Sequence, residues 1–234
     1  MNRVLDLATS VTATLSRLAS GGSVGNLGDR PETPLQLFEF ESCPYCRKVR
    51  EALSILDLTA EIFPCPKEGP RFRKQAKKLG GKVQFPYLAD PNTGKGMYES
   101  DEIVQYLFET YGDGNVPWLL SAGALTNLTA GLASVVRPLQ GIFYEPSTPP
   151  KQPLELYSFE SSPYCRIVRE VLCCLEIPYL LHNVAKGSPN RDAFVERSGK
   201  MMVPYLIDPT AGIEMFESRE IVAYLRETYA ESKT

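Results

Sequence analysis

The sequence contains almost no histidine, no long apolar run and no surplus of basic side chains. His182 is the only histidine among 234 residues, which excludes most zinc sites and most mechanisms that rely on an imidazole acid or base. Asp and Glu number 28 against 25 Lys and Arg, a net charge of −3, so we expect no nucleic-acid partner. No apolar stretch approaches the roughly 20 residues that a membrane-spanning helix needs. We therefore expect no membrane segment and no metal site.

Cysteine is also sparse, with residues 43, 46, 65, 165, 173 and 174 making up the set. Six cysteines are too few for a disulfide scaffold in a chain of this size. Residues 1–30 carry no basic segment followed by a continuous apolar one, so no secretory signal is visible. We expect an intracellular reducing compartment, either the cytoplasm or, if a targeting segment was removed, a plastid stroma. In such a compartment a close cysteine pair indicates redox chemistry or metal binding.

The chain does contain an internal repeat. Residues 35–50 align with residues 154–169 at an offset of 119, with 11 of 16 positions identical, and residues 97–111 align with 215–229 at an offset of 118, with 11 of 15 identical. We call residues 35–114 copy one and residues 154–234 copy two. Residues 1–34 and 115–153 precede them, and each includes an apolar helical pattern, over 1–20 and 119–137, followed by a Gly- and Pro-rich linker.

Each copy has the pattern of an α/β unit with the order strand, helix, strand, helix, strand, strand, helix. In copy one the expected helices cover 44–56, 71–79 and 100–111, with Ser100 as the N-cap of the last helix. The expected strands cover 35–40, 60–63, 86–89 and 96–98. The fold prediction is therefore two tandem α/β domains, each preceded by an amphipathic helix.

The strongest chemical signal is Cys43-Pro44-Tyr45-Cys46, which follows a predicted strand and opens a predicted helix. A thiol at a helix N-terminus is favoured as the thiolate by unpaired N–H groups and by the helix dipole. We expect Cys43 to be the nucleophile and the more deeply buried Cys46 to be the resolving thiol. A structural thiol pair is the alternative, because neither Cys65 nor His182 lies at a recognisable ligand spacing for a metal.

These features resemble glutaredoxins and the N-terminal, glutathione-binding domain of glutathione transferases, both of which have the thioredoxin-like fold. The resemblance covers about 35–112 and 154–230, and it rests on the Cys-Pro-Tyr-Cys turn, the Pro86 segment and the Glu99-Ser100 pair. It implies a fold of two tandem thioredoxin-like domains and glutathione as cosubstrate.

The resemblance also implies the glutathione-binding residues. In the family a cis proline follows the second helix, the residue before it binds the cysteinyl part of glutathione, and an acidic-Ser pair binds the γ-glutamyl end. The residues implied in copy one are Tyr45, Phe85, Pro86, Glu99, Ser100 and Asp101. A helix N-terminus that offers N–H groups to a carboxylate fits this role.

Copy one departs from the glutaredoxin pattern at Phe40, where a lysine or arginine usually helps to hold the glycine carboxylate of glutathione. Basic side chains on the second helix are candidates to replace it, and a solvated basic face explains them equally well. These side chains are Arg71, Arg73, Lys74, Lys77 and Lys78.

Copy two reads Ser162-Pro163-Tyr164-Cys165, so serine replaces the nucleophile and no disulfide can form within this motif. Its remaining candidate residues are Val203, Pro204, Glu217 and Ser218. Three interpretations are open for this copy: a degenerate structural domain, a glutathione site without redox turnover, or a serine-type transferase site.

Our leading hypothesis is a glutathione-linked thiol–disulfide oxidoreductase that acts on protein or small-molecule disulfides. The alternatives are glutathione transfer to an electrophile, a non-catalytic glutathione-binding or redox-sensing scaffold, and an iron–sulfur carrier. Some forty residues separate the copies, too few for the helical domain that follows in ordinary transferases. A substrate pocket could instead form at the domain junction, and the aromatic candidates for its lining are Tyr45, Tyr87, Trp118 and Tyr164. The oligomeric state is not predicted.

Overall fold

The computed structural model describes residues 8–12, 20–25, 27–121 and 140–231. Residues 8–12 are helical, and helix α5 covers Trp118–Ser121. Most of both predicted amphipathic helices lies outside the described residues.

Copy one has the predicted order of elements. Strand β1 (Leu35–Glu39) leads to α2 (Pro44–Ile55), β2 (Ala60–Pro64) and α3 (Phe72–Gly80), and a hairpin of β3 (Tyr87–Asp90) and β4 (Lys95–Met97) leads to α4 (Ser100–Tyr111). Gly81 ends α3 in a left-handed conformation, with φ of +83°, which glycine adopts without steric cost. One detail differs from the prediction: Ser100 is the first helical residue, and Glu99, with φ of +61°, is the N-cap of α4.

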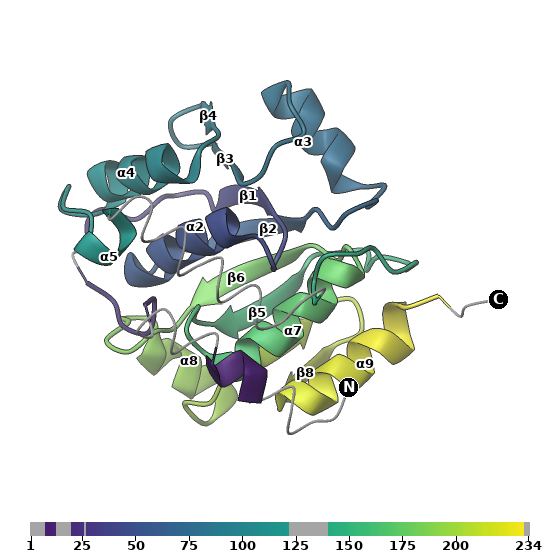
Figure 1. Ribbon diagram of the computed structural model, residues 1–234. Helices are drawn as coiled ribbons and strands as arrows, with labels where there is room; N and C mark the ends of the chain where they lie inside the picture. Colours follow the sequence, from purple (N-terminus) through teal and green to yellow (C-terminus); the bar gives the residue numbers. More distant parts are fainter. Residues whose placement is uncertain (1–7, 13–19, 26, 122–139, 232–234) are drawn as a thin grey trace.

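Copy two repeats this order (Figure 1). Its elements are β5 (Leu154–Ser158), α7 (Pro163–Cys174), β6 (Tyr179–Asn183), α8 (Arg191–Ser198), β7 (Tyr205–Asp208), β8 (Ile213–Phe216) and α9 (Ser218–Tyr229).

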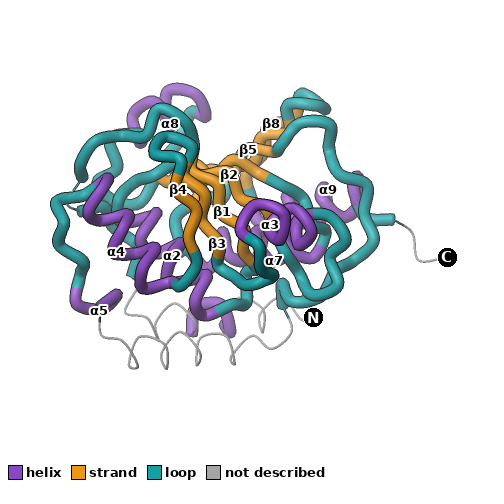
Figure 2. Tube along the Cα trace, turned by 90° about the horizontal axis from the view of Figure 1, so that it is seen from above, coloured by secondary structure: helices purple, strands orange, loops and turns teal. Residues whose placement is uncertain are grey.

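The two copies share one mixed sheet of eight strands in the order β4-β3-β1-β2-β6-β5-β7-β8 (Figure 2). Within each copy the first two strands are parallel, and the third is antiparallel to the first. The copies join through antiparallel pairing of β2 with β6, in which Glu61 lies opposite Leu180. This pairing covers the β2 edge of one half-sheet and the β6 edge of the other, and leaves β4 and β8 as the edges of the joint sheet.

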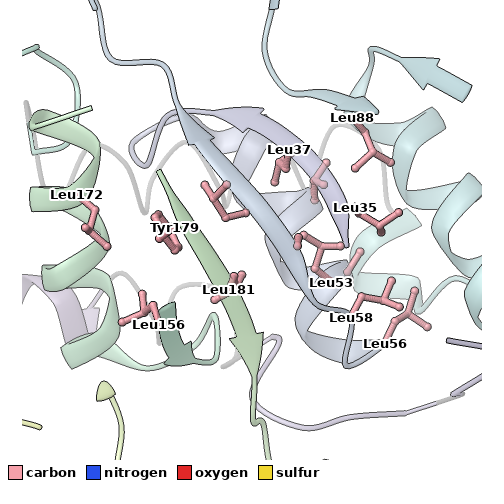
Figure 3. Packing of buried hydrophobic residues seen from close by; sticks show 14 of the residues in the cluster. Leu35, Leu37, Leu53, Leu56, Leu58, Leu88, Leu156, Leu172, Tyr179 and Leu181 are labelled. Atoms are coloured by element: carbon pink, nitrogen blue, oxygen red, sulfur yellow. The ribbon is translucent and has the colours of Figure 1, made fainter. Parts of the chain in front are cut away.

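Alternating side chains of the strands enter different cores. Leu35 and Leu37 point to the face covered by α2 and α4, whereas Phe38 joins the cluster beneath α3. Leu154 and Leu156 belong to the same hydrophobic cluster as Leu35 and Leu37, so the main core is continuous across both copies (Figure 3). The two copies therefore bury apolar surface together.

A reciprocal set of buried charges also joins the copies. We call Glu39, Glu41, Arg50, Glu160 and Arg169 the interface charge cluster. Each of these side chains is at most 5% exposed. Arg50 Nε lies 3.1 Å from Glu160 Oε2, and Arg169 Nε lies 3.1 Å from Glu41 Oε2. Glu160 and Arg169 occupy the positions of Glu41 and Arg50 in the repeat, and each arginine pairs with a carboxylate of the other copy as well as with one of its own copy.

The segments that precede the two copies make reciprocal contacts of the same kind. Ser23, which precedes copy one, forms a β-bridge with Lys186 of copy two, and Phe143, which precedes copy two, forms one with Lys67 of copy one. Ser10 donates from Oγ to the carbonyl of Pro163 at 2.8 Å, at the start of α7. Each linker thus contacts the copy that it does not precede, in addition to its own copy, as the Gly25–Ile55 and Glu145–Cys174 backbone hydrogen bonds show.

The part of the chain that the structure describes contains no helix with the length and hydropathy of a membrane span.

Candidate functional site

Cys43 is the N-cap of α2, at the point where the chain leaves β1. Its Sγ accepts a hydrogen bond from the Cys46 backbone N–H at 3.3 Å. Pro44 occupies the first helical turn, where its missing N–H leaves no unpaired donor. Cys43 is 4% exposed and Cys46 is fully buried, so the first thiol lies nearer to solvent than the second.

The two thiols have opposite pKa shifts. The Cys46 thiol and the backbone N–H groups of Cys46 and Tyr45 hydrogen-bond to Cys43, and they lower its pKa below the ordinary value despite burial and the charge of Glu39. Burial, together with the neighbouring Cys43, raises the pKa of Cys46 well above its ordinary value. Compared with an ordinary cysteine, this arrangement shifts Cys43 towards the thiolate and Cys46 towards the protonated thiol.

The cationic side chains next in sequence are directed elsewhere. Arg47 Nε lies 3.2 Å from Glu51 Oε1, and the buried Lys48 pairs with Asp101. The lowered pKa of Cys43 therefore follows from local hydrogen bonding, with neither cation among its main causes.

The Phe85–Pro86 peptide is cis, as is Val203–Pro204 in copy two, and both agree with the family resemblance. The Phe85 ring meets the Phe40 ring edge-on, with centroids 6.2 Å apart. Arg73 lies over the Phe85 ring, 5.0 Å from its centroid, and donates from Nε to the Pro66 carbonyl at 2.6 Å. The Arg73 guanidinium and the Phe40 ring thus both contact the Phe85 side chain, next to the cis proline.

Arg71, a sequence candidate for binding the glycine carboxylate, is engaged at the junction between the copies. Its Nη1 donates to Ser147 Oγ at 2.9 Å and to the Leu175 carbonyl at 3.0 Å, and its backbone N–H donates to Glu176 Oε1 at 3.0 Å. Lys74, Lys77 and Lys78 are exposed on α3. Arg73 is therefore the candidate that contacts the Phe85–Pro86 loop.

The N-terminus of α4 carries the acidic-Ser pair. Glu99 is exposed and accepts from Gln84 Nε2 at 2.5 Å, whereas Ser100 is buried. Asp101 is 62% exposed at its side chain even though it pairs with Lys48. The carboxylates of Glu99 and Asp101 both remain accessible to a cation.

Copy two reproduces the backbone of this site with different chemistry. Ser162 caps α7, and its Oγ accepts from the Cys165 backbone N–H at 3.3 Å, the distance found at Cys43. Glu217 has φ of +68° and precedes Ser218, the first residue of α9. Burial raises the pKa of Cys165, which favours its protonated form. The copy-two motif therefore presents a hydroxyl and a buried thiol.

The remaining cysteines are buried as well. Burial raises the pKa of Cys174 to about 11 and raises that of Cys65 further. Cys173 accepts from the Glu41 backbone N–H at 3.4 Å and donates to the Gly141 carbonyl at 3.2 Å. These contacts are structural, as expected for buried thiols that pack like small apolar side chains.

Among the described residues, no group of three His, Cys, Asp or Glu side chains is arranged to hold a metal ion.

The four aromatic candidates for a pocket at the junction have different surroundings. An open cleft of about 530 Å³ does lie where the copies meet, and its lining includes Glu61, Leu180 and Glu155. Tyr87 is buried in the core of copy one, and Trp118 is 66% exposed. Tyr45 and Tyr164 are each 48% exposed beside their own motifs. None of the four lines this cleft.

Comparison with known proteins gives one family and two solved structures. The family described as "Glutathione S-transferase, N-terminal domain" matches twice, over residues 37–115 and 156–233. No curated protein matches the sequence. A silkworm (Bombyx mori) glutathione transferase, BmGSTD1, shares 25% identity over 36% of this chain and 38% of its own length, with a TM-score of 0.32. The Leishmania protein TDR1, described as a unique trimeric glutathione transferase, shares 14% identity over 86% of this chain and 68% of its own, with a TM-score of 0.30. The present chain thus aligns with about two fifths of the silkworm enzyme.

Proposed function

This chain belongs to the family of glutathione S-transferase N-terminal domains, present here as two tandem copies, and we propose that copy one catalyses glutathione-linked thiol–disulfide exchange. The observation that carries the proposal is the pair of thiols at the start of α2. Cys43 has a lowered pKa and lies nearer to solvent, and Cys46 follows it with a raised pKa. A thiolate next to a protonated thiol suits the two successive steps of disulfide exchange.

In the first step the Cys43 thiolate attacks a disulfide between glutathione and a substrate thiol. A bond forms between Cys43 Sγ and the glutathione sulfur, the substrate disulfide breaks, and the substrate leaves as a thiolate that takes a proton from solvent. A second glutathione thiolate then attacks the mixed disulfide, releases oxidised glutathione and restores the Cys43 thiolate. Alternatively Cys46 loses its proton and attacks Cys43, which releases reduced glutathione and leaves a Cys43–Cys46 disulfide for two further glutathione molecules to reduce.

The surrounding residues provide the binding groups for glutathione. The backbone of Phe85, before Pro86, would pair with the cysteinyl part, and the N–H groups at the start of α4 would bind the γ-glutamyl carboxylate. Glu99 and Asp101 would bind its ammonium group. Arg73, beside Phe85, would bind the glycine carboxylate in place of the basic residue absent at Phe40. Because the reaction consumes reduced glutathione, we place it in a reducing compartment.

A direct test is to trap the intermediate. A Cys46→Ser variant, mixed with oxidised glutathione, should accumulate a Cys43–glutathione disulfide that mass spectrometry of intact and digested protein locates. The matched control is Cys165→Ser, which makes the same change at the equivalent position of copy two. Glutathione attached at Cys65 or Cys174, with Cys43 unmodified, would contradict the proposal.

Family membership also favours a second candidate, transfer of glutathione to a small electrophile. In that reaction the glutathione thiolate attacks a carbon atom and no protein disulfide forms. A Cys43→Ser variant would then carry a hydroxyl at the helix N-cap, as copy two does at Ser162, and a hydroxyl can donate a hydrogen bond to that thiolate. Conjugation of an electrophile that survives this substitution would favour transfer over disulfide exchange.

A further inference from the structure

Two polar side-chain pairs connect the three elements of the copy-one site. Gln84, just before the Phe85–Pro86 loop, donates to Glu99 at 2.5 Å. Lys48, on α2 two residues after Cys46, pairs with Asp101 in the first turn of α4. The N-terminus of α4 is thereby attached to the proline loop on one side and to the helix that carries the thiols on the other.

The Lys48–Asp101 pair is asymmetric in burial. The Lys48 side chain is 1% exposed and that of Asp101 is 62% exposed. A buried ammonium group must stay close to a partner, because leaving it unpaired away from water costs free energy. The Lys48 side chain is therefore held in place more firmly than a lysine that is exposed to solvent. Lys48 therefore holds one oxygen of Asp101 at a defined place, while the rest of that carboxylate faces solvent.

Copy two cannot form either pair. Its residues at the positions of Lys48, Gln84 and Asp101 are Ile167, Met202 and Arg219. An isoleucine and a methionine offer no donor to the acidic-Ser turn, and Arg219 places a positive charge where copy one has a negative one. Both connections are missing in the copy whose nucleophile position is serine.

We propose that Lys48 is a positioning residue for the amino end of glutathione: it holds the Asp101 carboxylate beside Glu99, so that the two acids together bind the ammonium group of the γ-glutamyl moiety. This inference rests on the proposed glutathione site, and it assigns to Lys48 a role in ligand selection rather than in disulfide chemistry. Copy two, with Arg219 repelling the same ammonium group, discriminates against glutathione.

The test compares two ligands that differ in the γ-glutamyl moiety, which carries the ammonium group that Lys48 is proposed to serve. S-methylglutathione carries the γ-glutamyl moiety, and S-methyl-cysteinylglycine lacks it. Binding of each to the full-length protein is measured by isothermal titration calorimetry, together with the melting temperature of every variant. Lys48→Met should weaken S-methylglutathione binding about tenfold, the factor expected from losing about 1.4 kcal/mol of a charge-assisted contact. Binding of S-methyl-cysteinylglycine should stay unchanged.

Three further variants separate positioning from a general structural effect. Asp101→Asn keeps the shape of the side chain and should reproduce the loss seen with Lys48→Met. Lys48→Arg keeps the positive charge and should restore most of the preference for S-methylglutathione. Ile167→Met makes a change of similar size at the equivalent position of copy two and should leave both ligands unaffected.

Equal weakening of both ligands by Lys48→Met, or no weakening of either, would overturn the assignment of Lys48. Failure of wild-type protein to bind S-methylglutathione would overturn it as well. The two proposals can fail separately. If wild-type protein binds S-methylglutathione selectively but reduces no mixed disulfide, the proposed exchange reaction is refuted. The comparison of Lys48 variants then still supports or refutes the role of Lys48.

Discussion

Arg50 of copy one lies 3.1 Å from Glu160 of copy two, and Arg169 of copy two lies 3.1 Å from Glu41 of copy one. This exchange of charges, together with β2–β6 pairing and a continuous core, makes the two copies one structural unit. The loop that carries Cys43 follows Glu41 directly, so copy two supports the chain on which the copy-one site is built. The second copy has this structural role whether or not it binds a ligand.

Removal of Arg50 should strongly destabilise the protein. Arg50→Met leaves buried carboxylates without their cation, which is expected to lower the free energy of unfolding by about 3–5 kcal/mol. Arg197→Met, which breaks the half-exposed pair with Glu214, should cost at most about 1 kcal/mol. Urea unfolding followed by circular dichroism measures both variants. Similar losses for the two would show that the interface charge cluster is not a main source of stability.

Glu39 should make stability depend on pH near neutrality. Burial raises the pKa of Glu39 to about 7. The positive charge of Arg50 acts in the opposite direction, and the negative charges of Glu41 and Glu160 offset part of that effect. A carboxyl group whose pKa is higher in the folded than in the unfolded protein stabilises the fold fully at a pH below its unfolded pKa. For Glu39 this contribution is lost as the pH rises through about 7. The free energy of unfolding should therefore fall more between pH 5 and pH 8 in the wild type than in Glu39→Gln.

Glu39→Gln is an informative comparison because Glu160, Arg50 and Arg169 keep their charges over this range. The pKa of Glu160 is lowered to about 2 by Arg169 and Arg50, which outweigh its burial, and both arginines stay protonated. Parallel profiles for wild type and variant from pH 5 to pH 8 would mean that Glu39 titrates at an ordinary pH.

Alkylation should distinguish the thiols. Cys43 has a lowered pKa, whereas burial raises those of Cys46, Cys65 and Cys174. Iodoacetamide at pH 7 should therefore modify Cys43 first, and its rate should approach a plateau at a lower pH than the rate for free cysteine. Peptide mass spectrometry over time gives the order of modification. Earlier modification of Cys65 or Cys174 would contradict the assignment of Cys43 as the nucleophile.

Restoring the missing cysteine in copy two should not create a second active site. Ser162→Cys places a thiol at an N-cap with the geometry of Cys43, yet Ile167, Met202 and Arg219 leave the acidic-Ser turn unsupported. In the Cys43→Ser background this substitution should recover less than about a tenth of wild-type activity, since one lost charged contact corresponds to about a factor of ten. Recovery to the wild-type rate would show that the cysteine alone determines which copy is active.

Much of the fold follows from local sequence. The alternation around Leu35 and Leu37, the helix start at Pro44 and the glycine after α3 each specify an element from neighbouring residues, and the repeat then specifies them twice. The family resemblance also gave both cis prolines correctly. These features depend on short-range chemistry and on a motif whose residues are adjacent in the chain.

The junction between the copies could not be predicted in the same way. Arg50 and Lys48 look like members of a solvated helix face, and only tertiary contacts show that both are buried. The sequence did contain a signal, because Glu41 and Arg50 recur in copy two as Glu160 and Arg169. Identity between the copies does not show, however, whether a charged side chain contacts its own copy or the other one. The pairing of β2 with β6 likewise depends on two edges that meet only in the folded chain.

We propose that Cys43 reacts with glutathione disulfides, and steady-state reduction of a glutathionylated peptide by glutathione, coupled to glutathione reductase, measures this reaction. Wild-type protein should turn over, and Cys43→Ser, shown to be folded by its melting temperature, should lose essentially all activity. Cys165→Ser, which alters the equivalent motif of copy two, should retain the wild-type rate. Equal turnover by wild type and Cys43→Ser, or no turnover by folded and reduced wild-type protein, would contradict the claim.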